Sequence, residues 1–450
     1  MACCNFVQQV QSMKKALLFL LFHGSLISVT HAQKKNGTKE SSTVLTNWMD
    51  LHCRMVRSTS GIAHVAYSRH FSYTAIVAYE SIVGSNPGYR SLLGQLNGLN
   101  NLPSLSKGDL YWPVSLNAAY AAMLRQFYSS FGSCAARIDS MEQAQTKQFA
   151  SEGINLQRIE KNIAYGQGVA AAIIQWLQTD GSANAKSYLP QKGQGLWAPT
   201  PPSFKEAAVP YWSENRSCTK DLKSLSILKQ PIYSPDSTGA FYPMAKEVYL
   251  VSSNLTPEQK ATALFWDDSP NGSYMTVYGH WSFILSGLIK KHNLPLIEAA
   301  EAFAKMTMAM HEASILAWKG KYQYNVVRPI TYIQQHIDKE WTPLISTPPH
   351  PEFPAAHATL SYAAATALCS LFGESCAVTD NTYTDIGLKE RTYGSLQDVA
   401  KEAGLSRLYG GIHYRYSIEQ GYLLGEAAAN HVLKKIHFQY TPRERQKTAP

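Results

Sequence analysis

The sequence predicts an all-α protein built from two helical-bundle-like halves. Its 450 residues are 45% hydrophobic and 16% charged, which is typical of a folded globular chain and excludes extensive disorder. Apolar residues recur at helical spacing over most of the chain. Alternating Val- and Ile-rich runs bounded by turns, which predict strands, are nearly absent. Helix-on-helix packing is therefore expected to form the core.

The N-terminal half is expected to hold several helices. Helical spacing of apolar residues runs from Trp48 to Ile82, and Asn86-Pro87-Gly88 then breaks the pattern. Further helices are expected over residues 115–131, 141–152 and 155–178. The last of these should stop at Thr179-Asp180-Gly181, because glycine commonly ends a helix.

The middle of the chain predicts a long irregular crossover. Residues 187–242 are rich in proline and have little periodicity. Helical signals resume at Thr256-Pro257-Glu258, where a capping threonine is followed by proline in the first turn. They continue over residues 294–318, 358–372 and 417–436.

These patterns divide the chain into seven parts. They are an upstream extension (1–12), a signal peptide (13–32), a flexible lead-in (33–44), an N-terminal helical half (45–186), the crossover (187–255), a C-terminal helical half (256–437) and a polar tail (438–450).

The predicted signal peptide begins at Met13-Lys14-Lys15. An apolar run from Ala16 to Val29 follows, and Thr30-His31-Ala32 places small residues where a signal peptidase reads them. Met13 is therefore the expected natural start. The apolar run is too short for a stable membrane span. We expect the mature protein to be soluble, and either secreted or periplasmic.

Charge and cysteine content limit the function classes. The net charge of +9 is scattered along the chain, so nucleic acid is not an expected partner. Cleavage would leave five cysteines, and an odd number in an oxidising compartment leaves at least one free thiol. Cys369 and Cys376 bracket a turn and could pair with each other. No CxxC motif supports cysteine-bound zinc or c-type haem.

Three motifs in the C-terminal half predict a site for a tetrahedral oxyanion. The first motif is Lys321, six intervening residues and Arg328-Pro329. The second is Pro354-Ala355-Ala356-His357. The third is Ser406-Arg407, five intervening residues and His413. Fixed cations can hold the oxygens of such an ion by charge-assisted hydrogen bonds. The second motif opens onto a predicted helix, whose free N–H groups attract anions.

The three motifs resemble those of the vanadium-dependent haloperoxidases and of the acid phosphatases that share their fold. Those families read Lys-x6-Arg-Pro, Pro-Ser-Gly-His and Ser-Arg-x5-His. Residues 164–181 and Tyr278-Gly279-His280-Trp281 also resemble exported bacterial members. The resemblance implies that Lys321, Arg328, Arg407 and the backbone of Ala356 hold vanadate, and that His413 bonds the metal. His357 would be the acid/base, with Lys321 assisting catalysis.

The resemblance also implies the reaction. Vanadate, staying pentavalent, would use hydrogen peroxide to oxidise a halide to hypohalous acid. Candidates for the halide pocket are Phe353, Trp318, Trp281 and His350, each of which has an ordinary structural role as the alternative. An organic acceptor and a second copy of the chain are left open as further partners.

The chain departs from the family pattern at two places. Ala355 and Ala356 replace Ser and Gly, which removes a hydroxyl donor and weakens anion binding by about 1 kcal/mol. Iodide or bromide is therefore favoured over chloride, because a weaker oxidant tolerates this loss. Ser417 stands where the phosphatases carry an Asp that orients the nucleophilic His. Serine cannot balance an imidazolium, so this position favours the peroxidase.

Two other functions remain open on the sequence. One is an acid phosphatase with His413 as nucleophile, and the other is a non-catalytic member that binds an oxyanion. Two further motifs are dismissed. Gly166-x-Gly168-x-x-Ala171 lies within a helical pattern without a preceding strand, and His311-Glu312 lacks the second zinc-binding histidine of a zincin.

Overall fold

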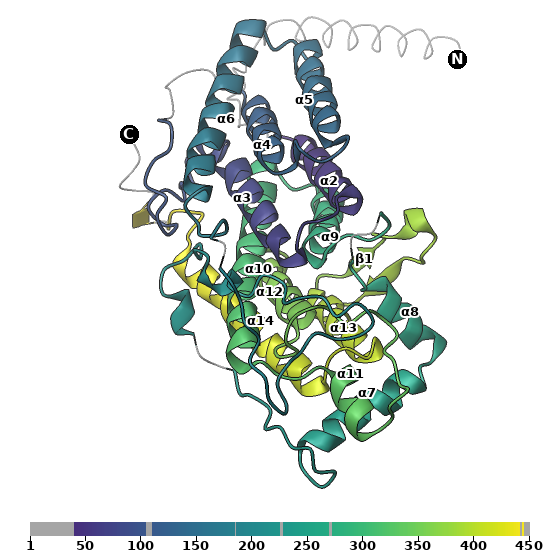
Figure 1. Ribbon diagram of the computed structural model, residues 1–450. Helices are drawn as coiled ribbons and strands as arrows, with labels where there is room; N and C mark the ends of the chain where they lie inside the picture. The colour runs from purple at the N-terminus through teal and green to yellow at the C-terminus, as the bar shows by residue number, and fades with distance from the viewer. Residues whose placement is uncertain are drawn as a thin grey trace, which may run out of the picture. The chain divides into compact units, whose positions relative to one another are not determined.

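Helices form the fold, as the sequence predicts (Figure 1). The computed structural model describes residues 40–104, 110–184, 186–225, 228–269, 272–441 and 443–444. The predicted upstream extension, the signal peptide and residues 33–39 of the lead-in lie outside these ranges, and a helix already begins at Thr43, within the last part of the predicted flexible lead-in. Within them the only sheet is an antiparallel pair of short strands, β1 (Val378–Asp380) and β2 (Arg391–Tyr393), with Val378 opposite Tyr393.

The N-terminal helices gather in the upper part of Figure 1. The pattern predicted as helical from Trp48 to Ile82 is divided in two around Gly61, whose φ of 84° lies in the left-handed region that favours glycine. The elements of this part are α2 (Thr43–Ser58), η1 (His64–Ala66), α3 (Tyr67–Glu80), η2 (Val83–Ser85), α4 (Trp112–Tyr128), α5 (Cys134–Ser151) and α6 (Leu156–Leu177).

In the residues that the structure describes between the end of α6 and residue 240, the chain is irregular apart from the single turns η3 (Trp212–Glu214) and η4 (Leu222–Ser224). The crossover is fastened beside the predicted oxyanion motifs. Leu196 forms a β-bridge with Val326, and the Ala208 amide donates to the Pro349 carbonyl oxygen at 2.7 Å. The predicted crossover extends to residue 255, but α7 (Phe241–Ser253) forms within it, burying Phe241, Ala245 and Val248.

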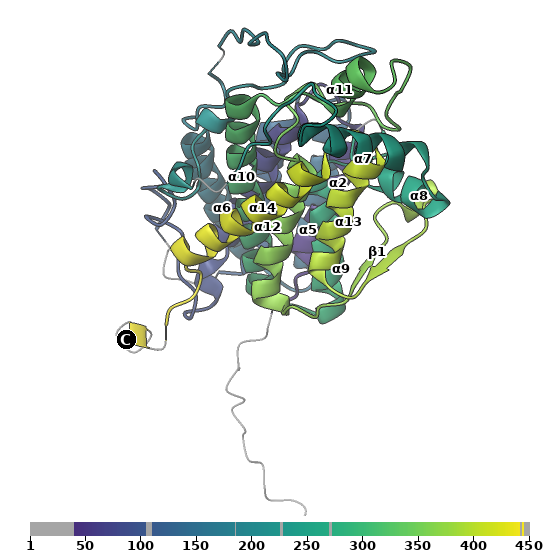
Figure 2. The same cartoon turned by 90° about the horizontal axis from the view of Figure 1, so that it is seen from below.

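The C-terminal helices surround α12, which carries the second motif. Figure 2 shows α14 crossing α12, and α12 also packs against α10 and α13. At α8, Thr256 and Gln259 form the two reciprocal hydrogen bonds of a capping box. The helices are α8 (Pro257–Phe265), α9 (Val277–His292), α10 (Leu296–Tyr324), α11 (Pro329–His336), α12 (Ala356–Phe372), α13 (Leu396–Tyr409) and α14 (Arg415–Lys435), with the turn η5 (Thr384–Ile386).

The largest cluster of buried apolar residues runs through helices of both halves of the chain. A second cluster, which includes Phe241, Tyr332, Phe353 and Tyr414, lies where α7 and α11 meet the oxyanion motifs. Among the described helices, none has the combined length and apolar character needed to cross a membrane. The five cysteines of the described ranges are all free thiols, so Cys369 and Cys376 do not pair.

The crossing of α12 and α14 is close because Gly425 has no side chain. A Cβ at this position would overlap the carbonyl oxygen of Thr359. His357 lies on α12, and His413 directly precedes α14. The spacing of these two helices therefore sets the distance between the two histidines of the motifs.

We therefore expect Gly425→Ala to destabilise the protein by about 1–3 kcal/mol, through overpacking against backbone that cannot move aside. Gly287→Ala on α9 is the matched control, because nothing lies within 4 Å of its Cβ. It should stabilise the protein by about 0.4–1 kcal/mol. Urea unfolding measures both free energies, and a neutral Gly425→Ala would contradict the close crossing.

Candidate functional site

One cavity of about 610 Å³ is lined by residues of the second and third sequence motifs. Its walls come from η1, the crossover, the loop after α8, the starts of α9 and α12, one residue each of α10 and α13, the loop before α12 and the loop after α13. Six of the predicted site residues line it, namely Trp318, His350, Ala356, His357, Arg407 and His413. Residues separated by up to 95 positions in the sequence therefore face one space.

The N-terminus of α12 lies at this cavity. Its N-cap residue, Ala355, makes no side-chain capping bond, so the first amides of the helix are not satisfied by a cap. The Ala355 amide itself donates to the Ser417 carbonyl oxygen at 3.1 Å, which ties the start of α12 to α14. Free N–H groups and the positive end of the helix dipole favour an anion at Ala356.

Arg407 supplies a cation in the last turn of α13. Its side chain is buried, and one guanidinium nitrogen donates to the Trp266 carbonyl oxygen. The Nε–H has no hydrogen-bond partner. Burial lowers the pKa of Arg407 while Asp267 and Asp268 oppose that shift, so the group remains a cation. A buried donor without a partner beside a cavity suits a bound oxyanion.

His413 is held as a neutral imidazole in a defined tautomer. Arg328 Nη1 donates toward its Nε2 at 3.2 Å, so the proton lies on Nδ1, which donates to Glu352 Oε1 at 2.7 Å. Burial, followed by the charges of Arg328 and Lys321, lowers the pKa of His413 well below its usual range. A neutral imidazole with a lone pair on Nε2 is what a metal ligand requires.

Glu352 is the residue that orients His413, and no sequence motif singles it out. This buried carboxylate also accepts from the Tyr414 amide at 3.1 Å and from the Ser417 hydroxyl at 2.6 Å. The expectation that His413 lacks a carboxylate partner is therefore wrong, because Ser417 holds the carboxylate and not the imidazole. The preference for a peroxidase that rested on Ser417 loses its basis.

Lys321 and Arg328 lie behind the cavity wall and are fully buried. The three N–H groups of Lys321 donate to the carbonyl oxygens of Pro351, Glu352 and Pro354 at 2.6 to 3.1 Å. Arg328 donates to the carbonyl oxygens of His350 and Ile412, both at 2.9 Å. Both cations therefore fasten the segments that carry His350 and His413, while adding positive charge beside the cavity.

His357 faces a second carboxylate that the motifs do not reveal. Its Nε2 lies 3.5 Å from Asp268 Oδ2, and neither atom has a hydrogen-bond partner. Burial and Arg407 lower the pKa of His357 to about 4, against the opposing effect of Asp268. His357 thus lies between a cation and an anion, a position suited to a group that exchanges protons.

The four halide-pocket candidates divide into two pairs. Trp318 and His350 line the cavity, with ring centroids 5.3 Å apart. Trp281 and Phe353 are fully buried away from its lining, and Trp281 donates from Nε1 to the Ser361 hydroxyl at 2.9 Å. The structure adds His64 of η1, which lines the cavity from the N-terminal half and has no sequence motif around it.

Comparisons with known proteins identify the fold and the family. Residues 301–441 match the family model described as the VCPO second helical-bundle domain. The fold matches the crystal structure of the first bacterial vanadium-dependent iodoperoxidase with a TM-score of 0.82 and 32% sequence identity, covering 90% of this chain and 99% of that one.

The chain belongs to the vanadium-dependent haloperoxidase family. Two bacterial vanadium-dependent chloroperoxidase structures share the haloperoxidase fold at lower identity. The holo form gives a TM-score of 0.64 at 15% identity, covering 82% of this chain and 91% of that chain, and the apo form gives 0.66 at 14%, covering 82% and 92%. No curated protein sequence matches the chain significantly.

The Glu352–His413 bond predicts how an oxyanion is held. Glu352→Gln should lower the affinity for orthovanadate about 10–100-fold, because an amide no longer holds the imidazole in one tautomer as a carboxylate does. Ser417→Ala is the matched control, since it removes one bond to the carboxylate and leaves the carboxylate in place. Equilibrium dialysis measures both affinities. Equal losses in the two variants would mean that Glu352 does not orient His413.

Proposed function

We propose that the protein is an exported vanadium-dependent haloperoxidase that uses hydrogen peroxide to oxidise iodide or bromide to hypohalous acid. One observation carries this proposal. The lone pair of His413, the Arg407 cation, the uncapped N-terminus of α12 and the acid/base His357 all meet at one cavity. Membership of the haloperoxidase family supports the same reaction.

The residues present fit vanadate. The Nε–H of Arg407 is a donor without a partner, and the first amides of α12 receive no bond from an N-cap side chain. His413 is neutral, with Nε2 available once Arg328 turns to an oxyanion oxygen. Vanadate, when bound, supplies a Lewis-acidic centre that activates hydrogen peroxide toward attack by a halide.

The fixed positive charges provide most of the stabilisation. Arg407, Arg328 and Lys321 are buried, so negative charge that develops in the cavity is not screened by water as it would be at the surface. A donor aimed at such charge typically contributes about 3 kcal/mol. Lys321 acts here through its charge alone, because its three N–H groups bond to carbonyl oxygens.

His357 moves the proton. Its Nε2 faces Asp268, so Nδ1 is the nitrogen that can take a proton from hydrogen peroxide and return it to the leaving oxygen. Asp268 stabilises the imidazolium that forms, which offsets the repulsion from Arg407.

Iodide or bromide suits this cavity better than chloride. The chain lacks a hydroxyl donor at Ala355, so the bound oxyanion receives one hydrogen bond fewer, and the more easily oxidised halides tolerate a weaker oxidant. His350, His64 and Trp318 line the space that a halide would enter.

An acid phosphatase with His413 as nucleophile is the second candidate. Glu352 favours it, because a nucleophilic histidine needs a carboxylate on its other nitrogen, and Glu352 Oε1 lies 2.7 Å from Nδ1. Export of either enzyme is a separate proposal, which rests on the leader at residues 13–32. An N-terminus near Gln33 in the mature protein would support it.

A comparison of two assays separates the two enzymes. We expect the vanadate-loaded protein to oxidise iodide in a peroxide-dependent manner, and the vanadate-free protein to leave p-nitrophenyl phosphate unhydrolysed. His413→Ala should abolish vanadium binding and iodide oxidation together. Phosphatase activity without any halide oxidation would overturn the haloperoxidase proposal.

Loss of the acid/base has its own expected size. His357→Ala should lower kcat for iodide oxidation about 10²–10⁴-fold, because the proton from peroxide loses its acceptor. His292→Ala, which changes an exposed histidine at the end of α9, is the control and should keep full activity. Steady-state rates with saturating vanadate measure the difference.

A further inference from the structure

A buried histidine behind the site, His280, contacts two carboxylates at once. It lies in the first turn of α9, and its side chain is fully buried. Its Nδ1 is 3.0 Å from Asp268 Oδ1, and its Nε2 is 2.8 Å from Asp380 Oδ2. Since both nitrogens face acceptors, both carry protons, and the ring is an imidazolium.

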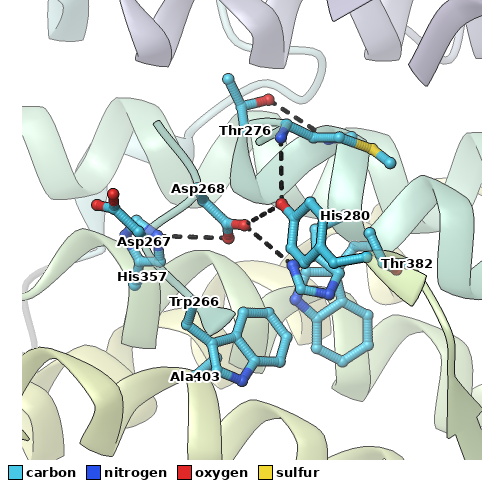
Figure 3. Close-up of polar contacts among 12 residues, drawn as sticks. Trp266, Asp267, Asp268, Thr276, His280, His357, Thr382 and Ala403 are labelled. Carbon is cyan, nitrogen blue, oxygen red and sulfur yellow. Dashed lines mark hydrogen bonds and ion pairs between the residues drawn. The ribbon is translucent and has the colours of Figure 1, made fainter. Parts of the chain in front are cut away.

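We propose that His280 is a positioning residue for the acid/base His357, and that it acts by fixing the carboxylate of Asp268 against it. This inference rests on the haloperoxidase function proposed above. Figure 3 shows Asp268 lying between His357 on one side and His280 on the other. The four side chains form a row in the order His357, Asp268, His280 and Asp380, in which His357 lines the cavity and the other three are buried.

The hydrogen bonds of Asp268 aim one of its oxygens at His357. Oδ1 accepts from His280 Nδ1 and from the Tyr383 hydroxyl at 2.7 Å, whereas Oδ2 has no hydrogen-bond partner and lies 3.5 Å from His357 Nε2. Asp268 also has a φ of 48°, which is unusual for a residue other than glycine. The two hydrogen bonds that Oδ1 accepts, from His280 and Tyr383, can hold Asp268 in this backbone conformation.

Charge keeps the arrangement in place. Burial alone would lower the pKa of His280, but Asp380 and Asp268 raise it to about 10. Burial likewise opposes ionisation of Asp268, yet His280 and His357 hold the pKa of that carboxyl well below its usual range. The titratable groups that face His280 are Asp268 from the loop after α8, Asp380 from β1 and the ring of Tyr383.

His280→Phe separates positioning from packing. The His280 ring stacks on Trp266 with centroids 4.1 Å apart, and the Trp266 carbonyl oxygen holds Arg407, so phenylalanine preserves the stack and the cation of the anion site. It removes both N–H groups and the positive charge. His52→Phe is the matched control, because His52 is a buried histidine stacked on Phe71 at 4.0 Å and is not among the residues that line the cavity.

We expect His280→Phe to lower kcat for iodide oxidation about 10–100-fold, while KM for iodide and the affinity for orthovanadate stay within about threefold of the wild type. His52→Phe should leave all three unchanged. Full kcat in a folded His280→Phe variant would overturn the proposal. So would an equal fall of kcat and vanadate affinity, because that result indicates a general loss of structure.

A second variant tests charge against geometry. His280→Phe leaves two buried carboxylates without a counter-ion, which should cost stability, and adding Asp380→Leu should restore the melting temperature. Because the bond from His280 Nδ1 to Asp268 is still missing, kcat should stay low. Recovery of kcat in the double variant would show that charge balance alone matters and would overturn positioning.

One measurement needs neither a variant nor turnover. Histidine NMR of vanadate-free wild-type protein should show His280 as an imidazolium up to a pH of about 10. The His280 signal is assigned as the one that is lost in His280→Phe or, if that variant does not fold, in His280→Gln. Titration near pH 6.5 would remove the basis of the proposal. If the wild type oxidises no halide while His280 still titrates near pH 10, the haloperoxidase function is wrong, and the contacts of His280 with Asp268 and Asp380 are still supported.

Discussion

The site depends on the ammonium group of Lys321 and the three carbonyl oxygens that surround it. These bonds join the last turn of α10 to the segment Pro351–Pro354. That segment carries Glu352, which bonds to His413. It leads directly into the N-terminus of α12, which carries His357, the proposed acid/base. An unpaired buried ammonium would be costly, so the lysine and the backbone hold each other in one arrangement. The three carbonyl acceptors around Nζ favour the charged ammonium group beside the cavity, although burial and Arg328 lower the pKa of Lys321 well below its usual value.

Each functional histidine has its own buried carboxylate, and the two carboxylates come from different parts of the chain. Glu352 precedes α12 and serves His413, while Asp268 follows α8 and serves His357. His413 faces the cations Arg328 and Lys321, and burial together with these charges lowers its pKa well below the usual range, which suits the ligand role proposed for it. His357 is balanced between Arg407 and Asp268, which leaves its proton movable. The environments differ although the residue type is the same, and environment is what separates a ligand from an acid/base.

Periodicity and motif spacing predicted the helical fold and the residues that converge on the cavity, because both signals are local in sequence. The roles of Glu352 and Asp268 could not be predicted from local signals, because their partners His413 and His357 lie 61 and 89 positions away in the sequence. Only the folded chain brings each pair together. The prediction from Ser417 was wrong because this residue has the expected spacing from His413 but bonds to Glu352 and not to the imidazole. Within Tyr278-Gly279-His280-Trp281, the tryptophan drew attention as a pocket aromatic, yet it bonds Ser361 in the core and the neighbouring histidine points toward Asp268. Adjacent helical residues face different directions, so a motif alone does not tell which of them faces the site.

An oxyanion frame of this kind serves two chemistries, and the carboxylate on His413 is compatible with both. What differs between them is the second reactant. A phosphatase must admit a phosphate ester with its organic group and then water, whereas a haloperoxidase must admit peroxide, a halide and, where one is used, an organic acceptor. The cavity of about 610 Å³ lies in the range of sites for small organic molecules, about 300–1,000 Å³. Its outer wall combines apolar residues such as Val209 and Leu360 with the imidazoles of His64 and His350. Space alone therefore does not separate the two reactions, because both need room beyond the anion site. The imidazoles of His64 and His350, whose N–H groups can donate to a halide, are the part of the wall that favours halide oxidation.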